Sequence, residues 1–171
     1  MFTRQGHSPN VKFPRILGIE CVGVVEAAAA PDTDIMVGQP VAALMGGMGR
    51  QYDGSYAEYT LVPSNQVIPL KNNDISKNIS WEMLAAIPET FLTAWGSLVE
   101  AMDVKSGQTI LVRGGTSSVR MAAISIAKQL VLTVVATTRN KNKIDALRNN
   151  GADYVIIDNG QIASEAKQLL S

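Results

Sequence analysis

The stretch Thr109-Ile110-Leu111-Val112-Arg113-Gly114-Gly115-Thr116-Ser117-Ser118 opens the segment that decides the fold. Its apolar run breaks into small residues, and an apolar stripe at helical spacing follows between residues 119 and 130. A second apolar run covers residues 131–138. Strand, turn, helix and strand in this order predict a right-handed βαβ unit with parallel strands. The small residues would then lie at a helix N-terminus, where backbone N–H groups can receive a phosphate.

The same alternation continues to the end of the sequence. A helix is expected around Ile144 and Leu147, a strand at residues 154–157 and a last helix at residues 162–170. The second half therefore predicts βαβαβα, which is one half of a doubly wound dinucleotide-binding fold. Two helices are expected before it, a short one behind Ser80 as its N-cap and another over about residues 89–102.

The first half has the pattern of short strands separated by Gly, Pro and Asp turns. We expect strands at residues 16–25, 41–45, 56–63 and 66–70, which together predict a small barrel-like all-β unit. A polar, Asn-rich segment follows these strands and indicates a boundary. The predicted domains are residues 1–75 and 76–171.

Composition excludes several classes of function. The 171 residues are 46% hydrophobic and 18% charged, as in a globular protein with a core. Fifteen basic and fifteen acidic residues cancel, so we expect no nucleic-acid or membrane partner. Cys21 is the only cysteine, and the N-terminus has no apolar run typical of a signal peptide. A soluble cytoplasmic protein is therefore expected.

Several short motifs recur together in one known family. They are Gly18-Ile19-Glu20, the segment 53–59 (Asp-Gly-Ser-Tyr-Ala-Glu-Tyr), Thr93-Ala94-Trp95 and Thr137-Thr138-Arg139-Asn140. The chain thereby resembles the medium-chain dehydrogenases/reductases, in their zinc-independent quinone-oxidoreductase-like branch. The resemblance implies a partial GroES-like β domain followed by the first half of a Rossmann fold, with substrate and NADPH between them. It also implies a possible homo-oligomer, and relatives with further residues before and after this sequence.

The phosphate loop of the family is a G-x-G-x-x-G frame, which here falls on residues 115–120. The frame assigns Gly115, Thr116, Ser117, Ser118 and Val119 to cofactor binding. Gly115 would make the tight turn, and Ser117 would allow close backbone approach. Arg120 replaces the third glycine, which normally lets the helix pack closely on the strand. Its side chain must either turn toward the phosphates or push helix and sheet apart, at a cost of about 1–3 kcal/mol.

The end of the second predicted strand indicates which cofactor binds. NAD-binding folds place an acid about 20 residues beyond the fingerprint, on the ribose hydroxyls. The segment 137–140 contains no acid, whereas Arg139 and Lys143 offer cations to a 2′-phosphate. NADPH is therefore favoured, the alternative being a solvated basic loop.

Metal ligands are scarce in the sequence. Ile19 stands where the resemblance places a zinc-binding histidine, Cys21 has no cysteine partner, and His7 is expected on the surface. No metal is therefore predicted, and the implied reaction is direct hydride transfer to a quinone or an α,β-unsaturated carbonyl.

No catalytic residue can be assigned from the sequence. By resemblance Thr93 would approach the nicotinamide carboxamide, the alternative being a helix threonine bonded to its own backbone. Phe2 would line the cleft. Two hypotheses stay open: an NADPH-dependent reductase, or a catalytically inert nucleotide-binding or interaction remnant. Arg120, and Val131 where relatives tend to have glycine, support the second.

Overall fold

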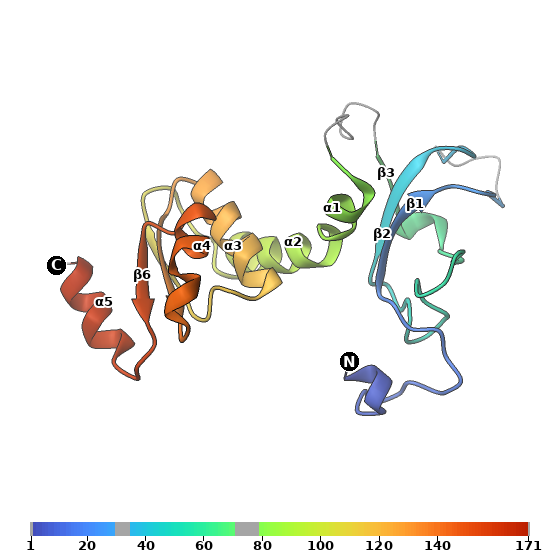
Figure 1. Cartoon of the computed structure of the whole chain (residues 1–171). Helices are drawn as coiled ribbons and strands as arrows, with labels where there is room; N and C mark the ends of the chain where they lie inside the picture. The colour runs from blue at the N-terminus through green and yellow to red at the C-terminus, as the bar shows by residue number, and fades with distance from the viewer. Residues whose placement is uncertain (1, 30–34, 71–78, 171) are drawn as a thin grey trace. The chain divides into compact units, whose positions relative to one another are not determined.

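The computed structural model describes residues 2–29, 35–70 and 79–170. The chain divides into two compact units, Met1–Glu89 and Thr90–Ser171, whose elements are labelled in Figure 1. The boundary predicted between residues 75 and 76 lies outside the described residues. None of the helices in the described part combines the length and the apolar character that crossing a membrane requires.

The first unit contains an antiparallel three-stranded sheet in the order β1-β2-β3. The register places Cys21 opposite Ala43 and Ala42 opposite Ile68. Ala42 and Ala43 are both buried on the central strand. This sheet corresponds to the predicted β unit. Its elements are η1 (Thr3–Gln5), β1 (Glu20–Val24), β2 (Pro40–Leu44), η2 (Ser64–Gln66) and β3 (Val67–Pro69).

The strand predicted at residues 56–63 is wrong, because the structure has irregular backbone there. The start of this segment is held by hydrogen bonds to residues 17–20 and not by a neighbouring strand. The Tyr56 N–H donates to the Leu17 carbonyl at 2.8 Å, and the Ser55 hydroxyl donates to the Glu20 carbonyl. These bonds satisfy part of the backbone without a strand partner. Tyr56 and Leu61 are 80% and 88% exposed, so neither face of the segment is buried as a sheet face would be.

Two helical elements follow, as predicted. Helix α1 (Trp81–Ala85) is capped by Ser80, whose Oγ accepts the Met83 N–H at 3.3 Å. Helix α2 (Pro88–Trp95) begins with proline and continues as the π-helical segment η3 (Gly96–Ala101). The Glu20 carboxylate accepts the Glu89 N–H at 2.7 Å, so an anion stabilises the N-terminus of α2.

The second unit confirms the predicted βαβαβα order. Its three strands are parallel, in the order β4-β5-β6, with Ile110 opposite Val134 and Ala136 opposite Val155. Helices α3, α4 and α5 all contact this sheet (Figure 1). The elements are β4 (Thr109–Val112), α3 (Ser118–Gln129), β5 (Thr133–Thr138), η4 (Lys141–Lys143), α4 (Ile144–Asn149), β6 (Tyr154–Ile157) and α5 (Ile162–Leu170).

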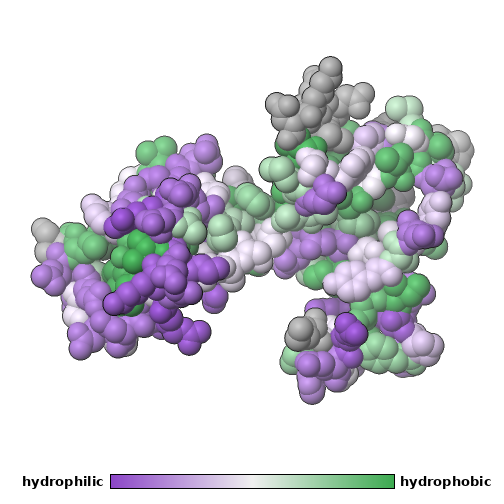
Figure 2. Space-filling view, viewed as in Figure 1, coloured by the Kyte–Doolittle hydropathy of each residue, from purple (hydrophilic) through white to green (hydrophobic). Residues whose placement is uncertain are grey.

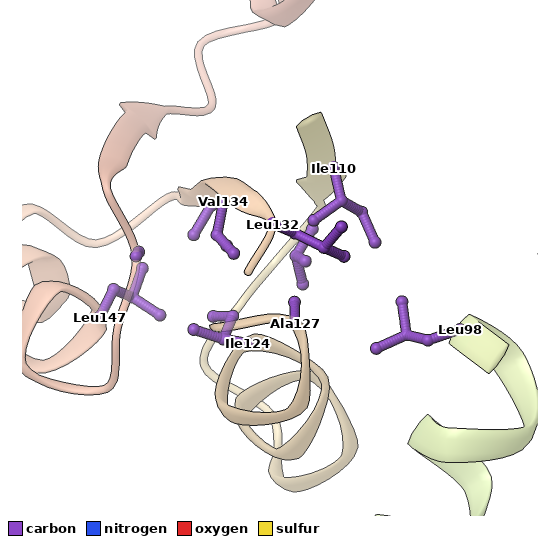
Figure 3. Close-up of a cluster of buried hydrophobic side chains, with 10 residues drawn as sticks. Leu98, Ile110, Ile124, Ala127, Leu132, Val134 and Leu147 are labelled. Atoms are coloured by element: carbon purple, nitrogen blue, oxygen red, sulfur yellow. The ribbon is translucent and has the colours of Figure 1, made fainter. Parts of the chain in front are cut away.

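A buried apolar cluster joins α3 and α4 to the sheet. Ile124 and Val134 are completely buried, and Leu147 reaches them from α4 (Figure 3). Burial of each large aliphatic side chain contributes about 1.5–3 kcal/mol, so this cluster is the main source of stability in the unit. The visible surface of the unit is mostly hydrophilic, with apolar residues gathered near its centre (Figure 2).

A salt bridge ties the C-terminal turn of α3 to the start of two strands. Lys128 Nζ lies 2.8 Å from Asp153 Oδ1, and Asp153 Oδ2 accepts the Val134 N–H at 2.7 Å. Partial burial acts to raise the pKa of Asp153, but the hydrogen bonds from Lys128 and Val134 outweigh it and lower the pKa. The carboxylate therefore stabilises the fold above its unfolded-state pKa, and this contribution is lost as the pH falls through the lower folded-state value.

Helix α3 ends in a Schellman motif that has valine at its left-handed position. The Leu132 N–H donates to the Ala127 carbonyl and the Val131 N–H to the Lys128 carbonyl, both at 3.0 Å. Val131 has φ +60° and is 68% exposed. A Cβ in this region costs about 1–2 kcal/mol, and a β-branched residue is especially unsuited to it.

Val131→Gly is therefore expected to raise the free energy of unfolding by about 1 kcal/mol, because glycine removes the strain and little burial is lost. Urea unfolding of both proteins measures the difference. Val131→Ala is the matched control and should gain less, since it keeps a Cβ at positive φ. A Val131→Gly protein no more stable than the parent would contradict the strain.

Candidate functional site

A pocket of about 390 Å³ opens beside the C-terminal ends of the three parallel strands. In open α/β sheets, ligands bind outside the carboxyl ends of the strands. The lining residues follow β4, begin α3, or end β5 and β6. They are Gly114, Thr116, Ser117, Arg120, Thr137, Thr138, Arg139, Asn140, Lys143 and Asp158.

The loop after β4 is fixed by the buried end of the neighbouring strand. The Gly114 N–H donates to Thr137 Oγ1 at 2.9 Å, and the Gly115 N–H donates to the Thr137 carbonyl at 2.8 Å. Thr137 itself is fully buried. One threonine therefore accepts two consecutive N–H groups and sets the path of the chain into α3.

The two glycines of the loop have different roles. Gly114 has φ +61° and makes the turn, which the fingerprint frame had assigned to Gly115. Gly115 is buried, and a Cβ there would stand 2.9 Å from Leu147 Cδ2 and 3.2 Å from Ile124 Cδ1. Gly115 is thus the residue that allows close packing of the helices on the sheet, a role that the frame assigns to its third glycine, where this chain has Arg120.

Helix α3 begins at the pocket. Ser117 is its N-cap residue in extended conformation, yet the serine side chain makes no capping hydrogen bond. The first N–H groups of a helix have no intrahelical partner and carry partial positive charge. Thr116 and Ser117 line the pocket, whereas Ser118 and Val119 start the helix and do not.

Arg120 turns toward the loop, which is the first of its two predicted alternatives. The side chain is exposed and lines the pocket. Its Nη1 lies 3.4 Å from Ser117 Oγ and would stand 3.5 Å from a Cβ at Gly114. The guanidinium therefore lies over the loop and not between helix and sheet.

The pocket has an excess of positive charge. Arg139 and Lys143 line it with Arg120, and none of the three forms an ion pair with a carboxylate in the described part of the chain. The pocket carboxylate Asp158 lies 3.6 Å from Arg113 Nη2 and accepts the Gly160 N–H at 3.3 Å. Such an arrangement favours an anionic ligand.

Sequence reasoning missed several lining residues, namely Gly114, Thr137, Thr138, Asn140 and Asp158. Their common signal is a polar or small residue at the end of a predicted parallel strand. Thr93 is not among the lining residues, and its carbonyl accepts the Ser97 hydroxyl at 2.8 Å. Its role at the nicotinamide stays a prediction.

The remaining titratable candidates lie in the first unit. Burial raises the pKa of the Cys21 thiol, against a hydrogen bond with the Ala43 backbone, so the reactive thiolate is disfavoured. His7 is exposed, and its ring lies 5.3 Å from that of Phe2. The described residues contain no group of three His, Cys, Asp or Glu side chains placed to hold a metal ion.

Thr137→Val should lower the free energy of unfolding by about 1–2 kcal/mol, because the Gly114 N–H loses its acceptor. Thermal or urea unfolding measures the loss. Thr133→Val, at the opposite end of β5, is the matched control and should change stability less. Equal effects of both substitutions would contradict the role assigned to Thr137.

Comparison with known proteins places this geometry in a family. Residues 1–72 match the alcohol dehydrogenase GroES-like domain. A phenolphthiocerol synthesis polyketide synthase of Mycobacterium bovis is 34% identical over 137 residues, which are 80% of this chain and 6% of that protein. A zinc-type alcohol dehydrogenase-like protein of Staphylococcus aureus is 27% identical over 173 residues, 98% of this chain and 50% of that protein.

Solved structures share the fold over almost the whole chain. An NAD-dependent alcohol dehydrogenase is 31% identical, with a TM-score of 0.86. The match covers 98% of this chain and 54% of the dehydrogenase chain. A quinone oxidoreductase of Pseudomonas syringae is 27% identical with a TM-score of 0.83, over 99% and 49%. A mycobacterial protein complexed with NADPH is also 27% identical with a TM-score of 0.83, over 98% and 50%.

The chain therefore spans about half the length of these dehydrogenases and quinone oxidoreductases. These structures include both an NAD-dependent enzyme and a protein complexed with NADPH, which supports a nicotinamide cofactor for the group. The GroES-like match, the parallel sheet and these shared structures identify the chain as a member of the medium-chain dehydrogenase/reductase superfamily.

Proposed function

We propose that the pocket at the ends of β4, β5 and β6 binds NADPH. We further propose that the chain belongs to a zinc-independent oxidoreductase that transfers hydride to a quinone or an α,β-unsaturated carbonyl. The observation that carries the proposal is the pair Arg139 and Lys143, which line this pocket without a carboxylate partner among the described residues.

The residues present fit the phosphate groups of the dinucleotide. Thr116 and Ser117, at the positive end of α3, suit the pyrophosphate. Arg139 can grip a 2′-phosphate with two parallel N–H donors, and Lys143 adds a flexible point charge. When bound, the nicotinamide supplies the hydride.

The choice of NADPH over NADH rests on the residues after β5. An NAD site has an acid there to accept hydrogen bonds from the ribose hydroxyls. Here β5 ends at Thr138, and Arg139 and Asn140 follow. The Thr138 hydroxyl accepts the Asn140 N–H at 3.1 Å, which shapes this turn. Asp158 comes from the next strand and is paired with Arg113.

Residues of the first unit support the proposal of hydride transfer without zinc. Ile19 replaces the histidine that the family resemblance places beside Glu20, and an alkyl side chain cannot ligate a metal. The Glu20 carboxylate, in turn, accepts the Glu89 N–H. A carbonyl acceptor would then need activation by its own conjugation, as a quinone or enone has.

A second candidate is nucleotide binding without turnover. It is favoured by Arg120, which stands at the third glycine position of the fingerprint, and by Val131, which occupies a left-handed turn position that suits glycine. The described pocket serves the adenosine and phosphate part of a dinucleotide, while hydride transfer also requires the nicotinamide and acceptor held in near-attack geometry.

Arg139→Ala is expected to weaken NADPH binding by about tenfold or more, because a charge-assisted pair with the 2′-phosphate is lost. NADH binding should change much less, since NADH lacks that phosphate. Isothermal titration calorimetry with both cofactors measures the difference. Lys141→Ala is the matched control, as Lys141 lies between Asn140 and Lys143 without lining the pocket. Equal losses for NADPH and NADH would contradict the assignment of NADPH.

The two candidates are separated by turnover. We expect the 171-residue chain to bind NADPH but to oxidise it with benzoquinone only slowly, because the alignment of both reactants supplies much of the rate. The rate of NADPH oxidation is measured from the loss of NADPH absorbance. The same assay is run on a longer chain, extended at both ends to the length of the relatives. Saturable oxidation at equal rates by both chains would exclude the binding-only candidate.

A further inference from the structure

We propose that Arg120 is a phosphate-binding residue for the 5′-side of the nucleotide, so that the pocket receives an adenosine carrying two separated phosphate groups. One phosphate would meet Arg120 and the N-terminus of α3, and the other would meet Arg139 and Lys143. This inference rests on the proposed function and adds a ligand-binding role to a residue that replaces glycine in the fingerprint.

The position of the guanidinium is the first argument. It lies over the loop, with Nη1 3.4 Å from Ser117 Oγ and next to Gly114. A contact of 3.4 Å is longer than the usual 2.7–3.2 Å for an N–H···O hydrogen bond, so it restrains the side chain only weakly. The guanidinium is therefore free to turn its donors to an anion at the start of α3.

The unfavourable electrostatics of this position is the second argument. The first turn of a helix prefers acidic residues, and α3 has none there. Arg120 instead adds a full positive charge to the positive end of the helix, in a pocket that already contains Arg139 and Lys143. Three cations without carboxylate partners in the described chain repel one another until an anion arrives.

The arrangement of the cations limits the class of ligand. Arg120 comes from α3, whereas Arg139 and Lys143 come from the turn and η4 after β5. Arg120 lies over the Gly114–Ser117 loop, beside the N-terminus of α3, whereas Arg139 and Lys143 follow the end of β5. We therefore assign one phosphate of a nucleoside to each group. Adenosine 2′,5′-bisphosphate is the smallest ligand with this chemistry, and 5′-AMP and 2′-AMP each carry one half of it.

The test is an NMR titration of the 171-residue chain with each of these three nucleotides. Arg120→Gln removes the charge at similar size and should weaken 5′-AMP and the bisphosphate about tenfold while leaving 2′-AMP unchanged. Arg139→Ala should weaken 2′-AMP and the bisphosphate while leaving 5′-AMP unchanged. Arg120→Lys should recover part of the loss, because the charge remains without the fork.

Stability provides an independent readout. Arg120 is exposed, so Arg120→Gln should fold and should melt slightly higher than the parent in the absence of ligand. Arg148→Gln is the control, because Arg148 is an exposed arginine in the last turn of α4, outside the pocket. This variant should leave nucleotide binding unchanged and should not melt higher than the parent.

The outcomes separate this inference from the proposed function. Unchanged or tighter 5′-AMP binding by Arg120→Gln, with 2′-AMP binding intact, would overturn the role of Arg120 alone. Equal weakening of 5′-AMP and 2′-AMP by that variant would also overturn it. If the parent protein bound none of the three nucleotides, the proposed function itself would fail.

Discussion

The hydrogen bonds of Thr137 are the constraint on which the site depends. This buried side chain and its carbonyl hold the N–H groups of Gly114 and Gly115, so the chain leaving β4 must cross the end of β5. The register between β4 and β5 therefore determines the conformation of the loop after β4. Only because the loop is fixed does α3 start at the pocket, with its unpaired N–H groups close to the cations that follow β5.

Much of this arrangement could be predicted from the sequence, because it depends on local patterns. Apolar periodicity was enough for the order of elements in the second unit, and Ser80 was recognised as a cap. The cations Arg139 and Lys143 were found from their distance along the chain to the fingerprint. Both line the pocket.

The rest depends on contacts between distant residues, which no local pattern encodes. A strand was predicted at residues 56–63, yet the Tyr56 N–H donates to the Leu17 carbonyl and the Ser55 hydroxyl to the Glu20 carbonyl. The tight turn was predicted at Gly115 but lies at Gly114, because Gly115 is needed for the close approach of Leu147 from α4. Asp158 was missed since its place at the pocket follows from strand order alone.

The close approach at Gly115 also has a consequence for how this protein can change. Leu147 and Ile124 belong to the apolar core, yet both stand directly beneath the loop. A larger or smaller side chain at either position would move the loop without touching any ligand. Core and site are therefore expected to evolve together. Substitutions at these positions that keep the side-chain volume can occur independently. A substitution that changes the volume must be compensated by a neighbouring residue if the loop is to keep its shape.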